Sequence, residues 1–221
     1  MRKIAVLLTL LVAIGITGSA SAAVYNFSPM PSRDLYDLDH YRYYTWGIDW
    51  RAHRGETITS ATLTFKNIWD WRVEPDNLYT HLLDWAPIPS STSNVRAYWD
   101  NQGGGDNFGA YHNGLGGGTY RGGYLIGNWT DPYGGRARNF DLVYNFTSPG
   151  LINALNTYAN NDGRFGFGLD PDCHYFNDGI TFSITTATPP PPPRDAVPEP
   201  TTLALFGLGA AAMGMIRRRR Q

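Results

Sequence analysis

Short stretches in which apolar and polar residues alternate, divided by clusters of Gly, Asn and Asp, most limit what this chain can fold into. The clearest stretch runs from Ile58 to Phe65, and its period of two is typical of a strand with one buried face. One predicted face carries Thr59, Ala61, Leu63 and Phe65, and the other carries Ile58, Ser60, Thr62 and Thr64. Five further strands are predicted at 77–83, 123–126, 141–146, 164–169 and 180–186.

One segment has helical spacing instead. Ser148 is suited to cap this helix, and Pro149 is suited to its first turn. The residues at helical spacing are Leu151, Ile152, Leu155 and Tyr158. Many short strands, one helix, and a chain with 25 Gly and 15 Pro predict an all-β fold, a β-sandwich or jelly roll with one short helix.

The N-terminus has the pattern of a secretory signal peptide. Arg2 and Lys3 precede an apolar run from Ile4 to Ile16, and small residues follow. This run is shorter than the ~20 residues that a membrane-spanning helix needs. We therefore expect residues 1–23 to be a signal peptide that is removed after Ala22 or Ala23.

The C-terminal segment, 197–221, combines three parts. Pro198, Glu199 and Pro200 are followed by an uncharged run at 201–216 and then by four arginines. The run is close to the ~17-residue minimum for a transmembrane helix, and the arginines suit its cytoplasmic side. A plain membrane anchor is the alternative interpretation, although such an anchor does not need the Pro-Glu-Pro triplet.

This order of parts resembles the PEP-CTERM sorting signal. The resemblance implies recognition by an exosortase, a transient hold in the inner membrane, cleavage near Pro198-Glu199-Pro200, and delivery to the surface or surroundings of a Gram-negative cell. It also implies an association with exopolysaccharide production. The exported part is similar to the β-sandwich ectodomains of PEP-CTERM proteins over the stretches 43–50, 55–71, 82–84 and 166–184. This resemblance implies the fold and the location of the protein but no particular activity.

The exported part is acidic. Between the signal peptide and Pro200, 12 Lys and Arg stand against 19 Asp and Glu, a balance that disfavours nucleic acid and anionic membranes as partners. Within it we expect the ectodomain at 24–187 and a Pro-rich linker at 188–196. Cys173 is the single cysteine, so no disulfide forms within the chain, and a buried, inert thiol is expected.

An acidic loop between two predicted strands is a candidate calcium site. Oxygen ligands that lie close together on a loop are what Ca²⁺ requires. The alternative is that the same residues only form turns, because Asp-Pro and Asn-Asp-Gly are turn sequences in their own right. The candidate ligands are Asp170, Asp172, Asn177 and Asp178, with Asp37, Asp39 or Asp49 to complete the shell if the first and last strands pair.

The histidines give a weaker signal for a metal site. Cys173 and His174 are adjacent, which predicts side chains on opposite faces and argues against a shared ion. His81 alternates with Leu82 on a predicted strand, so we expect it to be a satisfied residue of the sheet rather than a ligand.

Aromatic side chains suggest a sugar-binding surface. Trp69 and Trp71 are two residues apart, so they share a face if that piece is extended. The alternative is that these rings fill the core of the sandwich. No nucleophile elbow, zinc-protease motif or phosphate-binding loop is present, and no carboxylate pair stands out, so we expect no enzyme.

These observations together predict an exported, exosortase-processed protein of the cell surface or extracellular matrix, whose non-catalytic β-sandwich binds exopolysaccharide. One alternative is a structural or adhesive biofilm matrix protein without a defined ligand site. A less favoured alternative is a glycan-active enzyme.

The calcium hypothesis is decided by thermal melting with and without chelator. A bound ion stabilises the folded protein by RT ln(1 + [L]/Kd), about 2.7 kcal/mol at a hundredfold excess over Kd. If the loop binds calcium, EDTA lowers Tm and added Ca²⁺ restores it. An unchanged Tm favours the interpretation of the loop as turns alone.

Overall fold

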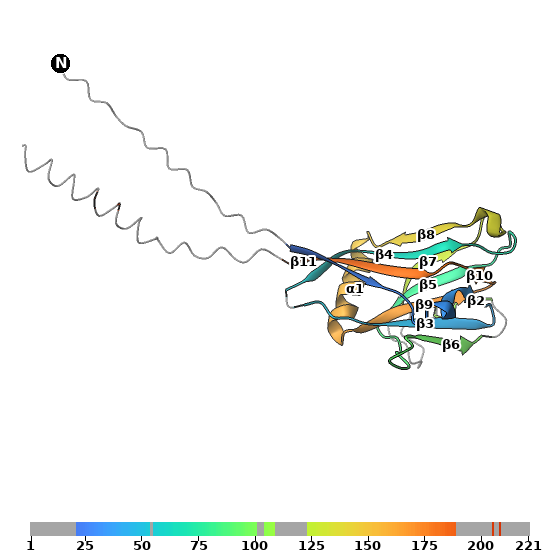
Figure 1. Cartoon of the computed structure of the whole chain (residues 1–221), viewed down its shortest axis with the longest axis horizontal. Coiled ribbons are helices and arrows are strands. Elements are labelled where there is room, and N and C mark those ends of the chain that lie inside the picture. The colour runs from blue at the N-terminus through green and yellow to red at the C-terminus, as the bar shows by residue number, and fades with distance from the viewer. Residues whose placement is uncertain are drawn as a thin grey trace, which may run out of the picture. The chain divides into compact units, whose positions relative to one another are not determined.

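Antiparallel β-sheets are the main secondary structure of the described chain (Figure 1). The computed structural model describes residues 21–53, 55–100, 104–108 and 123–188, together with Leu205 and Leu208. The part between Ser21 and Thr188 is called the body below. The rest of the predicted signal peptide, the linker from 189 onward and most of the sorting segment lie outside the described residues.

Two main sheets have the strand orders β1-β11-β4-β8 and β6-β3-β9-β5-β7. The first sheet contains β1 (Ser21–Phe27), β11 (Ile180–Thr188), β4 (Thr57–Ile68) and β8 (Phe140–Asn145). The second contains β6 (Val95–Trp99), β3 (Arg42–Asp49), β9 (Arg164–Pro171), β5 (Leu78–Leu83) and β7 (Tyr124–Trp129). The smaller elements are the sheet of β2 (Asp37–Leu38) and β10 (Tyr175–Phe176), the helix α1 (Pro149–Asn161), and the 3-10 helices η1 (Ser32–Leu35) and η3 (Arg136–Arg138).

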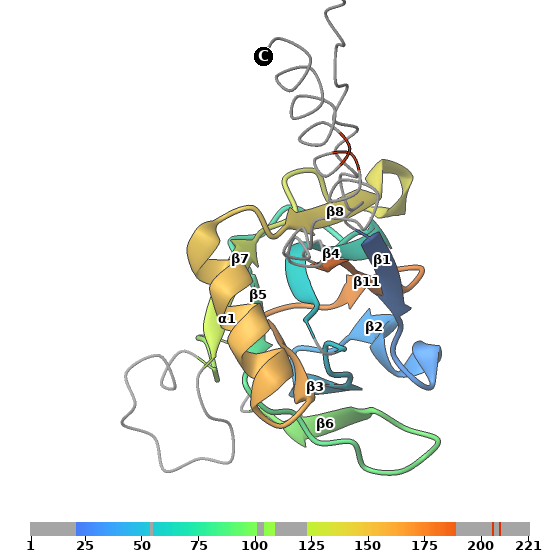
Figure 2. The same cartoon turned by 90° about the vertical axis from the view of Figure 1, so that its left-hand side faces the viewer.

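The two main sheets form two layers, and α1 lies beside the gap between them (Figure 2). The helix packs against β4 of the first sheet and against β9 and β7 of the second. Phe182 of β11 lies in the core between the layers. Its ring centroid is 4.8–6.2 Å from the rings of Phe27, Phe146, Phe165 and Phe167. The predicted all-β sandwich with one helix is therefore confirmed.

The six strands predicted from the sequence correspond to β4, β5, β7, β8, β9 and β11, with ends that differ by at most three residues. Sequence reasoning missed β1, β3 and β6, and also the two-residue strands β2 and β10. Residues 44–48 of β3 are all buried, so this strand lacks the alternation on which the prediction depended. β1 was hidden because it begins within the predicted signal peptide, where Ser21–Ala23 pair with Thr186–Thr188.

The predicted position of Ile58 was wrong. Its side chain is 1% exposed and belongs to the same core as Leu63 and Phe65, although Ile58 was assigned to the opposite face. The cause is a bulge, because the register between β4 and β11 shifts between Thr185 and Thr186. One extra residue in a strand reverses the faces on either side of it.

The predicted helix is confirmed, with its cap. The Ser148 side chain accepts a hydrogen bond from the backbone N–H of Leu151, and Pro149 begins the helix. On the buried face, Asn156 donates to the carbonyl of Ile58 and accepts from its N–H, both at 2.9 Å. This side chain thus replaces a strand partner beside the bulge and fixes the helix to β4.

Among the residues that the structure describes, no helix is both long enough and apolar enough to cross a bilayer. Leu205 and Leu208, in the predicted apolar run of the sorting segment, are helical.

A glycine in the middle of the second sheet provides a test of this packing. A Cβ on Gly166 would overlap the carbonyl group of Trp46 and lie 2.5 Å from the Ala86 Cβ. Because the first obstacle is backbone, we expect Gly166→Ala to lower the free energy of unfolding by about 1–3 kcal/mol and Tm by roughly 2–12 °C. Thermal melting followed by circular dichroism measures the change.

Gly123→Ala is the matched control, because a Cβ there meets side-chain atoms no closer than 3.6 Å. An equal loss of stability in both variants would contradict the proposed packing.

Candidate functional site

A short segment after β9 connects three parts of the chain that are distant in sequence. Tyr175 and Phe176 of β10 pair with Leu38 and Asp37 of β2. On its other side, Phe176 exchanges two backbone hydrogen bonds of 3.0 Å with Trp69. The segment is therefore held from both sides.

Buried groups anchor this segment. The side chain of Asn177 donates to the carbonyl of Leu35 at 2.7 Å, and its backbone N–H donates to Tyr36. Tyr175 of the segment, its strand partner Leu38 and the nearby Leu35 are all fully buried. Burial is the main cause that raises the pKa of the Tyr175 hydroxyl above its ordinary range, so this group stays protonated.

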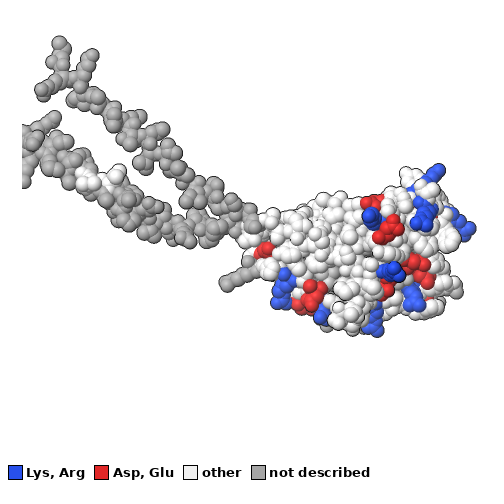
Figure 3. Space-filling model, viewed as in Figure 1, with Lys and Arg blue, Asp and Glu red and all other residues white. Residues whose placement is uncertain are grey.

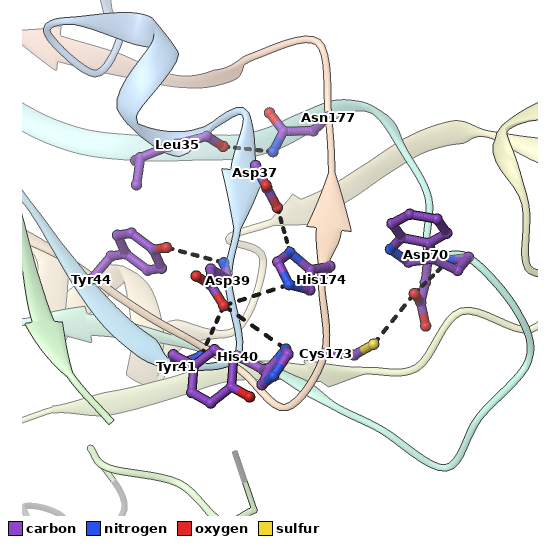
Figure 4. Close-up of polar contacts among 11 residues, drawn as sticks. Leu35, Asp37, Asp39, His40, Tyr41, Tyr44, Asp70, Cys173, His174 and Asn177 are labelled. Atoms are coloured by element: carbon purple, nitrogen blue, oxygen red, sulfur yellow. Dashed lines mark hydrogen bonds and ion pairs between the residues drawn. The ribbon is translucent and has the colours of Figure 1, made fainter. Parts of the chain in front are cut away.

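A cluster of two histidines and two aspartates forms where β10 meets β2 (Figure 4). Nδ1 of His174 lies 2.9 Å from Oδ1 of Asp37, and Nε2 of the same ring lies 3.6 Å from Oδ1 of Asp39. Nδ1 of His40 lies 3.8 Å from the same Asp39 oxygen. The two histidine side chains and Asp39 are 26–30% exposed, so solvent and small ligands reach the cluster.

A second group lies around Cys173, on the other side of the loop (Figure 4). The thiol donates to Oδ1 of Asp70 at 3.4 Å, and Glu74 and Asp76 complete the group. Burial, followed by the negative charge of Asp70, raises the pKa of Cys173 to about 12. The thiol is therefore protonated and unreactive at neutral pH. This agrees with the expected inert cysteine, although Cys173 is half-buried rather than buried.

Adjacent Cys173 and His174 serve different groups, as the sequence predicted. In Figure 4 the thiol points toward Asp70, while the imidazole points toward Asp37 and Asp39.

Aromatic rings continue outward from the histidines on both sides. Together they form what we call the aromatic strip, in which the centroids of neighbouring rings are 4.1–5.9 Å apart. Trp99 at one end and Trp71 at the other are 74% and 65% exposed. In order of contact, the strip consists of Trp99, Tyr41, His40, His174 and Phe176, and Phe176 contacts both Trp69 and Trp71.

The structure brings Trp69 and Trp71 together, as their spacing predicted. Both rings contact Phe176, Trp69 in a stack at 4.6 Å and Trp71 edge-on at 5.7 Å. Trp69 is half-buried, and only Trp71 is fully open to solvent.

The four candidate calcium ligands each have a different set of partners. Asp172 accepts from the backbone N–H groups of Asn77 and Gly104. Asp178 accepts from the side chain of Asn67, and Asn177 binds Leu35 and Gly179. These contacts are of the kind expected for turns, and calcium binding by this loop stays a prediction.

The fourth candidate, Asp170, is fully buried on β9 and accepts two hydrogen bonds from Asn107, one from its backbone and one from its side chain. Burial raises the pKa of Asp170 to about 7, and the negative charge of Asp100 also raises it, while the bonds from Asn107 oppose the shift. The charged carboxylate is therefore disfavoured in the folded state.

Sequence reasoning considered His40 and His174 separately, and it did not identify Tyr41 or Trp99 as part of a site. The sequence offered only a local indication of the site. The pair His40-Tyr41 and the run His174-Tyr175-Phe176 each place a histidine next to other aromatic residues and close to an aspartate. Their contact across more than 130 residues depends on the pairing of β2 with β10. No periodicity in the sequence predicts that pairing.

Asp170 makes stability depend on pH. Its pKa is about 7 in the folded body and near 3.8 in an unfolded chain. Between these values only the folded state holds the proton, so its contribution to stability falls as pH rises from about 4 to about 7. We expect the free energy of unfolding of Asp170→Asn to decrease less with rising pH than that of the wild type. At pH 8 we expect the variant to be more stable than the wild type by roughly 2–4 kcal/mol.

Urea unfolding at pH 4.5 and pH 8 measures this difference. Asp162→Asn is the control, since Asp162 is exposed and accepts a local hydrogen bond from Arg164. Parallel pH profiles for the wild type and Asp170→Asn would show that the buried carboxyl is not the source.

Comparison with known proteins gives one match. Residues 196–220 match the family model of the PEP-CTERM protein-sorting motif. No curated protein and no solved structure matches the chain. The match includes the Pro-Glu-Pro triplet and the arginines on which the resemblance was based. C-terminal to its mostly β-sheet body, this chain therefore carries a PEP-CTERM sorting motif, which marks it as an exported protein targeted to an exosortase.

Proposed function

We propose that the body binds extracellular polysaccharide without cleaving it, through the aromatic strip. The observation that carries the proposal is the exposure of Trp71 and Trp99 at the two ends of a continuous row of rings. Large rings are expensive to leave in water, and exposed aromatic surface marks an interaction site. An elongated row of rings suits an elongated polymer better than a compact ligand.

Polar groups beside the strip provide hydrogen bonds for sugar hydroxyls. The carboxylates of Asp37 and Asp39 lie along its centre and accept hydrogen bonds. A hollow of about 230 Å³ near the Trp99 end is lined by Asp34, Arg42 and Tyr44, with Val95 and Ala97. Arg42 pairs with Trp99 across β3 and β6, which places this hollow next to the strip.

The charge distribution also suits a neutral polymer. Acidic and basic side chains lie side by side on the face shown in Figure 3, over the part of the body that contains β2 and β10, and much of the face carries neither sign. A polyanion such as nucleic acid would require a field of one sign, which this face lacks.

The proposal of a non-catalytic role is supported by the contacts of the two glutamates of the body. Glu56 accepts from the Tyr25 hydroxyl and from the backbone of His53, and Glu74 pairs with Arg72. Each glutamate is thus engaged in a local contact, and Glu74 also lies in the group of Asp70, Asp76 and Cys173, whose donor atoms are within 4.8 Å of one another. We propose that these carboxylates are structural rather than the acid and base of glycoside hydrolysis.

Binding of the full chain to a panel of bacterial exopolysaccharides tests the proposal. We expect Trp71→Ala and Trp99→Ala each to weaken binding about tenfold, which corresponds to about 1.4 kcal/mol for one exposed anchor. Tyr133→Ala is the matched control, because Tyr133 is also exposed but packs beside Arg138 rather than in the strip.

Three results would contradict this function. Equal binding by all variants would show that the aromatic strip does not bind the polysaccharide. Self-association without binding to any polysaccharide would instead support a structural matrix role. Release of soluble sugar that disappears in an Asp→Asn variant would establish an enzyme.

A further inference from the structure

The geometry points to a divalent transition-metal site of the zinc class, formed by Asp39, His40 and His174. The three residues offer one carboxylate oxygen and two imidazole nitrogens, all within 4.8 Å of one another. This site goes beyond polysaccharide binding and does not depend on it.

The spacing of the donor atoms fits a shared ion better than hydrogen bonds. Zinc binds nitrogen and oxygen at about 2.0–2.1 Å, so two ligand atoms of a tetrahedral site lie about 3.3 Å apart. The observed distances from Asp39 Oδ1 are 3.6 Å to His174 and 3.8 Å to His40. Both exceed a normal hydrogen bond and lie within about half an ångström of the zinc spacing. The third pair, one nitrogen of each imidazole, lies within 4.8 Å.

The partners of these ligands have the arrangement that metal sites require. Asp37 lies 2.9 Å from Nδ1 of His174, where it accepts that N–H and leaves Nε2 free to face Asp39. A carboxylate that orients a ligating imidazole in this way is the usual second partner of a bound metal.

Asp39 is itself held in place. Its carboxylate accepts from the backbone N–H of Tyr41 at 3.0 Å, and its own N–H donates to the Tyr44 hydroxyl at 3.0 Å. The ligand oxygen is therefore positioned by the start of β3, independently of His174.

The donor set favours zinc-class ions over calcium. Calcium takes six to eight oxygen ligands, whereas imidazole suits Zn²⁺ and its neighbours in the first transition row. Three protein ligands leave a fourth tetrahedral position for water or for an incoming oxygen ligand.

A bound ion would connect distant parts of the chain. Asp39 and His40 come from the turn between β2 and β3, and His174 comes from the loop between β9 and β10. The ion would stabilise the same contact that the pairing of β2 with β10 makes, and it would order the centre of the aromatic strip.

Zinc titration tests the site directly. The full chain, purified without a His tag and freed of metal with chelator, is titrated with ZnCl₂ by calorimetry, and Tm is measured with and without the ion. We expect one Zn²⁺ per chain and a higher Tm. Co²⁺ in place of Zn²⁺ should give the visible absorption of a tetrahedral site.

Variants separate ligands from bystanders. We expect His40→Gln and His174→Gln to abolish this binding, and Asp37→Asn to weaken it about 10- to 100-fold, since Asp37 orients a ligand without touching the ion. His53→Gln is the matched control, because His53 is exposed and outside the cluster.

Melting without metal shows whether each variant is folded. No zinc binding by the wild type would overturn the site, whatever the variants do, and so would equal binding by the wild type and both ligand variants. Neither result bears on polysaccharide binding, which is measured without added metal.

Discussion

The antiparallel pairing of β2 with β10 is the contact on which the candidate site depends. Two residues on each strand pair, and Trp69 extends the arrangement on the far side of Phe176. So short a pairing has little stability of its own. It persists because the paired Leu38 and Tyr175 and the nearby Leu35 are buried, and because Asn177 satisfies the carbonyl of Leu35.

The two-layer core provides the rigid support for this contact. β9 lies at the centre of the second sheet and leads directly into the loop that carries Cys173 and His174, while β3 follows His40. Because both strands pair with each other, the loops at their ends are held side by side. Site residues on loops that a sheet positions are a common arrangement in β-sandwiches.

Cys173 and His174 illustrate how one loop serves two environments. The thiol turns inward to a buried carboxyl and stays protonated, whereas the imidazole turns outward to the exposed Asp37 and the half-buried Asp39. The opposite orientations of these two neighbouring side chains separate a structural contact, made by the thiol, from a surface that ligands can reach. The sorting motif and the body likewise have separate roles: the motif targets the protein to an exosortase, and the body carries the aromatic strip.

The sequence by itself determined the sorting motif, the all-β class, six strands and the capped helix, because each depends on residues that are close along the chain. It also predicted that Trp69 and Trp71 share a face and that Cys173 and His174 do not. Only the tertiary structure decided that Ile58 is buried, through a bulge, and that the rings of His40 and His174 are in contact. Those outcomes depend on strand register and on pairing between distant segments, which are fixed by the packing of the whole core rather than by any local pattern.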